Sequence, residues 1–143
     1  MKYALVNDMI EIFGAEEMSQ LTDRGTAGVA LPDSALIQNA IEDAEAEIDA
    51  YLVSRYALPL AIIPDNLKRL TCDVARYQLY GAALTEEVEK RYKSAITFLK
   101  NVSSGIAALG AQSSGAAPKS DNPVEYFGSG RTFSSERLKD YCD

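Results

Sequence analysis

Residues that could carry out catalysis or hold a metal are scarce in this chain. None of its 143 residues is a histidine, which is the commonest general base of enzymes and the commonest metal ligand. Serine, lysine, tyrosine or carboxylate chemistry remains open in principle, but no arrangement of these residues defines an active site. We therefore expect a protein that is not an enzyme and has no catalytic residue, no cofactor and no metal.

Five acidic residues between positions 42 and 49 come closest to a metal-binding cluster. At the rotation of about 100° per residue in an α-helix, Glu42, Glu45 and Asp49 fall on one flank, and Asp43 and Glu47 fall on the other. Acidic side chains that are split between two flanks cannot converge on one ion, and a run of charge on a helix is usually a solvated face. We expect both flanks to face solvent or a partner.

Two other features resemble chemical motifs only superficially. The loop Gly128–Arg131 has the glycines of a phosphate-binding loop, but no strand precedes it and no Lys-Ser/Thr pair or helix start follows it. We interpret it as a flexible turn. Cys72 has apolar neighbours and is expected to be a small core residue, while Cys142 lies far away near the C-terminus. The two cysteines show neither a disulfide framework nor metal-ligand spacing.

Charge and length exclude several further classes. Lysine and arginine number 14 against 21 acidic residues, which gives a net charge of −7, and the basic residues do not cluster as a nucleic-acid surface requires. At 47% hydrophobic residues, the chain can bury one modest core. Asp8 and Glu11 interrupt the first apolar residues too early for a signal peptide, and no window is apolar enough to span a bilayer. We expect a soluble protein made in a cytoplasm.

The longest predicted helix begins at Asp33, whose carboxylate can accept hydrogen bonds from the free N–H groups of the first turn. Its apolar residues fall on one stripe about a third of the circumference wide, as expected of a helix with one core-facing side. These residues are Ile37, Ala40, Ile41, Ala44, Ile48, Tyr51 and Leu52.

A corner follows the long helix, because Pro59 and Pro64 forbid its continuation and the residues between them are too apolar to stand in water. Arg55 would fall back on the apolar stripe if the helix continued. The helix therefore either ends before Arg55 or buries an ion pair there, and Asp49 and Asp73 are the candidate partners. We expect such a pair to fix the corner that begins at Tyr56.

The remaining periodic segments predict four more helices. Two short ones, Asp8–Phe13 capped by Asn7 and then Ala15–Leu21, lie before the long helix. Leu67–Gly81, capped by Asp65 or Asn66, is apolar on two sides and is sandwiched either by its own chain or by a neighbouring subunit. The last helix starts after Thr85 and runs to Val102. The predicted fold class is all-α: a small bundle of three main helices and two short N-terminal ones, with an extended C-terminal tail.

The composition changes after this bundle. Residues 103–123 are rich in Ser, Gly, Ala and Pro and resemble a linker, because they cannot bury enough apolar area to offset the cost of ordering them. We therefore divide the chain into a helical domain, 1–102, and a linker with an extended tail, 103–143. Apolar residues beyond Pro123 have the pattern of a segment that docks on another surface.

The order of the residues resembles a known family. The run from Ala40 to Leu60, the P-x-x-L that begins at Pro64 and the run DVARYQLYG from Asp73 closely resemble small phage and prophage proteins of the Mu-like type. These are related to the head–tail connector (adaptor) proteins of tailed bacteriophages. The N-terminal helix opening and, in the tail, Arg131, Phe133, Ser134 and Leu138 are also similar. The matching positions of the main block are Asp43, Ala44, Ile48, Asp49, Tyr51, Leu52, Arg55, Tyr56, Pro59, Leu60 and Pro64, followed by Asp73, Ala75, Arg76, Tyr77 and Leu79.

The resemblance implies a structural protein of the virion neck, at the head–tail interface, made in the cytoplasm of a bacterial host. It implies a dodecameric ring of identical subunits beneath the portal protein, in contact with head-closure or tail proteins, through which DNA passes without sequence recognition and without a membrane. An acidic ring suits such a channel because like charge prevents sticking. Glu42, Glu45 and Asp49 are candidates to line it or to face solvent. The candidate docking residues of the tail are Tyr126, Phe127, Arg131, Phe133, Leu138 and Tyr141.

Two other classes of function remain open from the sequence. The first is a cytoplasmic helical interaction or regulatory module whose tail folds on a partner, and it would form a small fixed oligomer that ignores the portal. The second is a small hydrolase, which the missing histidine disfavours.

Overall fold

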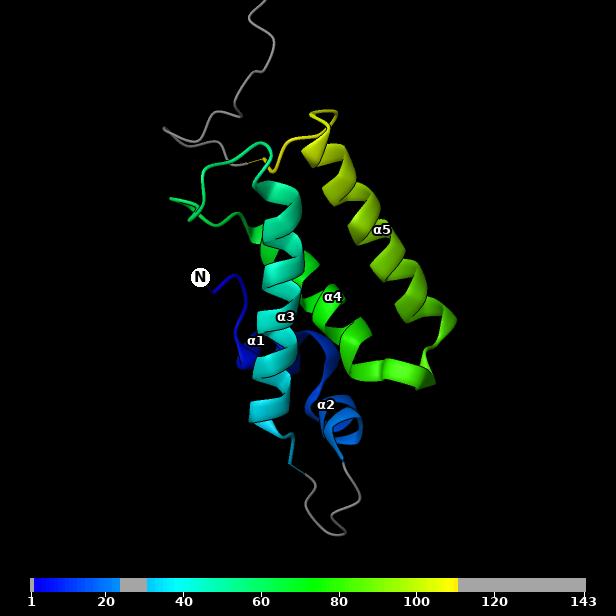
Figure 1. Ribbon diagram of the computed structural model, residues 1–143. Coiled ribbons are helices and arrows are strands. Elements are labelled where there is room, and N and C mark those ends of the chain that lie inside the picture. Colours follow the sequence, from blue (N-terminus) through cyan, green and yellow to red (C-terminus); the bar gives the residue numbers. More distant parts are fainter. Residues whose placement is uncertain (1, 24–30, 111–143) are drawn as a thin grey trace, which may run out of the picture.

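The computed structural model describes residues 2–23 and 31–110, and this part of the chain is a bundle of α-helices without a strand. The predicted class is confirmed, since three long helices follow two short ones (Figure 1). The elements are α1 (Val6–Phe13), α2 (Ala15–Thr22), α3 (Ser34–Leu52), α4 (Asp65–Tyr80), a 3-10 turn η1 (Gly81–Ala83) and α5 (Glu86–Ser103).

The caps predicted for α3 and α5 are confirmed. The carboxylate of Asp33 accepts hydrogen bonds from the N–H groups of Ala35 and Leu36, at 2.9 and 3.3 Å. The hydroxyl of Thr85 accepts one from the N–H of Val88 at 3.4 Å. Both side chains satisfy donors that have no acceptor within the first helical turn, so the starts of the two long outer helices are determined locally.

The predicted starts of the other two helices need correction. Asn7 lies inside α1 and does not cap it, because the Asp8 carboxylate accepts from the N–H of Leu5 at 2.8 Å and the helix begins at Val6. The start of α4 is two residues earlier than predicted, with Pro64 in extended conformation as its N-cap residue. Neither Asp65 nor Asn66 is the cap.

The inner stripe of α3 forms much of the core, as predicted. Of the seven apolar residues assigned to it, Tyr51 is half-buried and the other six are buried. Toward the start of α3 they pack with residues of α1, α2 and α4, and toward its end with residues of the corner and of α5. The core is therefore continuous along α3, which every other helix but η1 contacts.

Helix α4 is sandwiched within its own chain. It packs between α3 and α5, and its basic side faces the short N-terminal helices, where Lys68 pairs with Asp8 at 3.1 Å and Arg76 with Glu17 at 2.6 Å. Cys72 is fully buried in this core, as predicted, and burial raises the pKa of its thiol to about 12. The apolar second side of α4 is therefore accounted for without a neighbouring subunit.

The chain turns back at the end of α5 and packs against the corner. Gly105 has a φ of 80°, and the N–H of Ile106 donates to the carbonyl of Asn101, five residues earlier, which is the pattern of a Schellman cap. Leu109 is then buried, 1% exposed, in the cluster around α3 and the corner. The packed body therefore extends past the boundary predicted at residue 102, at least to Leu109.

Candidate functional site

The corner between α3 and α4 is held by the segment that follows α5. Tyr56 is 7% exposed, and its hydroxyl accepts from the N–H of Leu109 at 3.2 Å, while the amide nitrogen of Asn66 donates to the carbonyl of Leu109 at 2.9 Å. Leu60 is buried beside them, as the prediction of a packed corner requires, but Ile62 is 51% exposed. The corner is thus a rigid junction that also presents an apolar side chain to the outside.

The ion pair predicted for Arg55 is wrong within the part of the chain that is described. Helix α3 ends at Leu52, and the N–H groups of Arg55 and Tyr56 both donate to the Leu52 carbonyl, so the chain turns away from the inner stripe of α3. The half-buried guanidinium of Arg55 lies against Gly105, where an added Cβ would stand 2.7 Å from Nη1. Its buried Nε has no hydrogen-bond partner.

Both candidate partners of Arg55 are engaged elsewhere. Asp49 accepts a hydrogen bond from the hydroxyl of Tyr3. Asp73 lies 3.6 Å from Arg69 and 3.8 Å from Arg91, and its burial raises its pKa despite the attraction of these two guanidinium groups. Among the described residues Arg55 therefore has no ion pair, where the sequence predicted one with Asp49 or Asp73.

The acidic flank assigned to the channel or to solvent also needs correction. Glu45 is only 7% exposed, and its Oε1 accepts from the N–H of Tyr3 at 2.5 Å. Asp49 is half-buried under the Tyr3 hydroxyl, and Tyr3 itself is 2% exposed. Burial, and then the Asp49 carboxylate, raise the pKa of this tyrosine. The N-terminal segment before α1 covers this flank, a contact that helical periodicity does not reveal; Glu42 is exposed as predicted.

The opposite acidic flank is divided in the same way. Asp43 is exposed, while Glu47 accepts from the hydroxyl of Tyr92 of α5 at 2.8 Å. Burial, and next Glu47, raise the pKa of Tyr92 to about 12. Tyr92 also stacks on Tyr77 of α4 with ring centroids 3.8 Å apart. No group of acidic or cysteine side chains in the described ranges could hold a metal ion.

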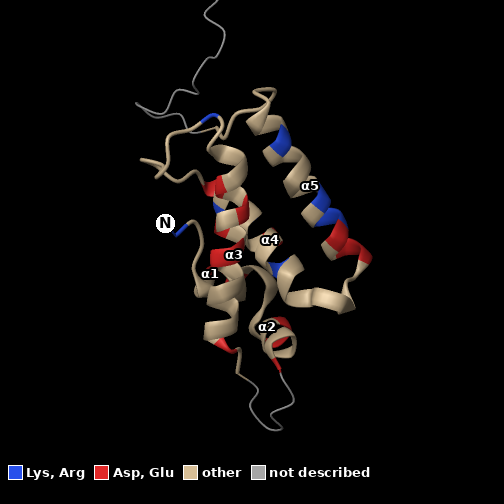
Figure 2. Cartoon of the chain, in the orientation of Figure 1, with Lys and Arg blue, Asp and Glu red and all other residues tan. Residues whose placement is uncertain are grey.

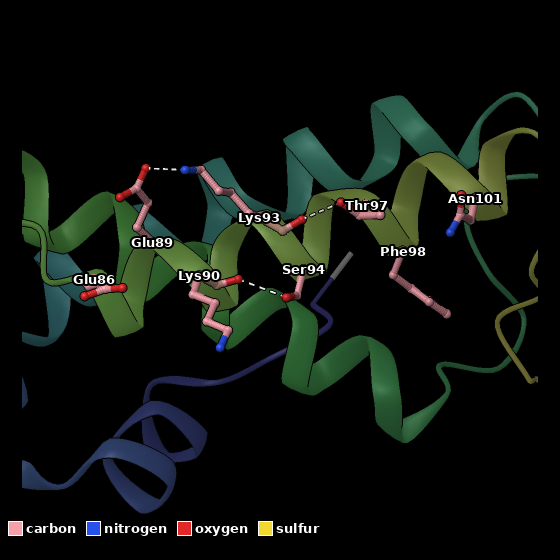
Figure 3. Close-up of a pocket in the computed structure, with 8 residues that line it drawn as sticks. All are labelled: Glu86, Glu89, Lys90, Lys93, Ser94, Thr97, Phe98 and Asn101. Carbon is pink, nitrogen blue, oxygen red and sulfur yellow. Dashed lines mark hydrogen bonds and ion pairs between the residues drawn. The ribbon is translucent and has the colours of Figure 1, made fainter.

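One hollow lies on the outer face of α5, and all its described lining residues come from that helix (Figure 3). Lys93 pairs with Glu89 at 2.6 Å, and the hydroxyls of Ser94 and Thr97 donate to backbone carbonyls four residues earlier. Figure 2 shows both basic and acidic residues along α5 and acidic residues along α3. The hollow is a charged helix surface, and its hydroxyls are engaged with the backbone.

The sequence interpretation missed two residues of the junction, Tyr3 and Leu109. A signal existed for Leu109, because it is one of only two large apolar residues in the polar stretch that follows α5, the other being Ile106. The predicted docking residues of the tail, from Tyr126 to Tyr141, lie outside the described residues. The described helices include none that is long and apolar enough to cross a membrane.

Comparison with known proteins identifies the class as that of a phage protein. The family model described as Bacteriophage Mu, Gp36 matches residues 3–126. Gene product J of Escherichia phage Mu is 35% identical over 126 residues, which is 87% of this chain and 89% of that protein. Mu-like prophage FluMu protein gp36 of Haemophilus influenzae is 40% identical over 90 residues, 63% of this chain and 64% of that protein. The chain belongs to the bacteriophage Mu Gp36 family, and the predicted resemblance is confirmed.

Proposed function

We propose that this protein is a head–tail connector, or adaptor, of the virion: a structural protein that forms a dodecameric ring beneath the portal and leaves a passage for DNA. The observation that carries this proposal is the position of the residue block that resembles connectors. Its residues from Asp43 to Pro64 form the second half of α3 and the corner, which is the junction that the N-terminal segment, α5 and the residues after α5 all contact.

The rest of the described structure supports a structural role over a catalytic one. Its polar side chains are used to join helices: Glu17, Glu45 and Glu47 accept hydrogen bonds from groups on other elements. The large hollow on α5 holds no nucleophile paired with a base. The protein therefore acts by assembly, with the portal above it and head-closure or tail proteins below it in the virion neck.

Passage of DNA then depends on overall charge. Of the acids assigned to the channel, Glu45 and Asp49 accept hydrogen bonds from the backbone N–H and the hydroxyl of Tyr3, so these side chains do not line it. The net charge of −7 still disfavours adhesion of a phosphate backbone to the ring. The passage is non-specific, and the tail beyond residue 110 provides a docking segment for the portal or an adjacent subunit.

Light scattering of the full chain, alone and with purified portal, tests this proposal. We expect a ring that binds the portal, and electron microscopy of portal-containing particles should show it at the portal's outer end. A regulatory module would instead give a small fixed oligomer that does not change when portal is added. That result, or particles in which the protein is absent, would overturn the proposal.

A further inference from the structure

The end of the bundle that contains the corner exposes two large apolar side chains that lie on neighbouring segments. Val53, at the end of α3, is 64% exposed, and Ile106, after α5, is 80% exposed. The hydroxyls of Ser54 and Ser103 lie 3.0 Å apart, and Arg55 lies against Gly105, so these two segments are direct neighbours. We call Val53, Arg55 and Ile106 the corner patch.

Ile106 occupies a position that is usually covered. It is the residue after the left-handed glycine of the Schellman cap, where an apolar side chain commonly packs back on the last turn of its own helix. Here it projects outward instead. A single exposed apolar side chain is common, but here Val53 is exposed on the adjacent segment, so the two form an apolar surface of the kind that marks a contact site.

The corner patch combines its apolar side chains with a single positive charge. Arg55 is the only charged residue from Ala50 to Pro64, and residues 103–110 contain none. Figure 2 shows this end of the bundle largely free of charge. The guanidinium has no ion pair or hydrogen bond from its buried Nε among the described residues. A complementary ligand would carry one carboxylate with apolar residues on both sides.

The sequence of this chain contains one such segment beyond the described residues, Val124–Phe127. Glu125 has Val124 before it and Tyr126 and Phe127 after it, with no lysine or arginine within five positions on either side. Glu136 and Asp140 each have a basic residue next to them, and Asp121 and Asp143 are not placed between apolar residues. The family match ends at residue 126 and so includes Glu125.

We propose that Val124–Phe127 of one subunit docks on the corner patch of the next, with Glu125 paired to Arg55 and the apolar residues covering Val53 and Ile106. Val53 and Ile106 are exposed among the described residues, and the proposed ring places a second copy beside each subunit as the source of the occupant. Fourteen peptide units separate Gly110 from Val124 and reach about 45 Å when extended, enough to pass to a neighbour. A contact of this kind is heterologous, and it generates a ring when the rotation between neighbours closes. This inference rests on the proposed ring.

Cysteine cross-linking of the full chain tests the docking directly. Two variants, I106C/C142S and Y126C/C142S, are mixed under conditions in which the wild type assembles; Cys72 stays reduced because it is buried. We expect a disulfide-linked dimer that contains one copy of each variant. The matched pair S19C/C142S and Y126C/C142S, with its cysteine on α2, should give none. The absence of a cross-link between I106C and Y126C would overturn the proposal. A third variant, I106C/Y126C/C142S, carries both cysteines in one chain, and a cross-link found only within that chain would overturn it as well.

Charge exchange gives an independent test. R55E and E125R should each weaken assembly, on the order of tenfold, and the double variant R55E/E125R should restore it; E136R is the control for a charge change in the tail. If R55E fails to fold, the assembly of E125R and the cross-linking result still test whether Glu125 docks on the corner patch. Cross-linking to portal in place of the neighbour would also contradict the proposal. A wild type that assembles neither alone nor with portal would instead overturn the proposed function.

Discussion

The two ends of this helical bundle differ in how an arginine is paired, although each end exposes an apolar residue, Leu31 at one and Ile106 at the other. At the end where α1 and α2 cover α4, Arg76 makes two hydrogen bonds to Glu17, at 2.6 and 3.1 Å, and its guanidinium lies 4.5 Å from the ring centre of Phe13. At the corner end, Arg55 has no such partner among the described residues, and Val53 and Ile106 are exposed. Arg76 is therefore expected to stabilise the fold of its own subunit, and Arg55 to contribute little to it.

The largest expected effect is a difference in unfolding free energy between two truncations at the corner end. A chain that ends at Val102 loses Leu109, which fills the space between Tyr56 and the α3 core, and should lose about 2–5 kcal/mol of unfolding free energy. A chain that ends at Gly110 should melt like the full chain. Urea unfolding of both compares them, and equal stability of the two truncations would show that Leu109 does not belong to the core.

A matched pair of arginine substitutions tests the comparison of the ends. Arg76→Ala should cost about 2–3 kcal/mol, because it leaves the largely buried Glu17 carboxylate without its ion partner. Arg55→Ala should cost about 1 kcal/mol or less in the isolated subunit, since no carboxylate is abandoned. Thermal or urea unfolding measures both, and Arg76→Lys serves as a control for charge without the second hydrogen bond. A larger loss at Arg55 would contradict the comparison.

Alkaline pH should weaken the helix contacts that tyrosines make with α3. The pKa values of Tyr3 and Tyr92 are raised in the folded state, Tyr92 to about 12, so the folded chain holds these protons after the unfolded chain has lost them. Their contribution to stability is complete below pH of about 10 and declines as pH rises toward the folded pKa values. Urea midpoints from pH 8 to 12 should fall less steeply for Tyr3→Phe/Tyr92→Phe than for the wild type. Parallel curves would contradict this assignment.

The smallest expected effect on the fold is at the corner patch. Val53→Ser and Ile106→Ser should change the unfolding free energy by no more than about 0.5 kcal/mol, because both side chains are exposed in the subunit. Circular dichroism melting measures this. A loss above about 1 kcal/mol would mean that these side chains stabilise their own subunit, and the two ends would then differ less than described.

Much of the fold could be predicted because it is encoded locally. The periodic stripe of α3, the caps at Asp33 and Thr85 and the prolines of the corner depend on residues close together in sequence. The burial of Glu45 could not be predicted, since it depends on Tyr3, which is far away along the chain. Asp73 combines a local i,i+4 contact with Arg69, which the spacing permits, and a contact with the distant Arg91, which it does not reveal. Two carboxylates of similar spacing can thus be exposed or buried, depending on which segment crosses the helix.

The same reasoning explains the outcome for Arg55. Helical projection placed its side chain on the inner stripe of α3, but the helix stops at Leu52 and the following turn directs the guanidinium to Gly105. Helical periodicity predicts the direction of a side chain only for residues within the helix. Beyond Leu52, the surface that the Arg55 side chain contacts depends on how α5 ends. The sequence indicates that end only through Gly105 and the apolar residues that follow it.

Electron cryo-microscopy of portal-containing particles tests the central claim most directly. We expect a ring of this protein at the outer end of the portal, with the corner patch of each subunit in contact with a segment of its neighbour and Ile106 covered by it. Particles without the protein would contradict the connector function. A ring in which Val53, Arg55 and Ile106 all face open solvent would contradict the conclusion that the corner end is the assembling end.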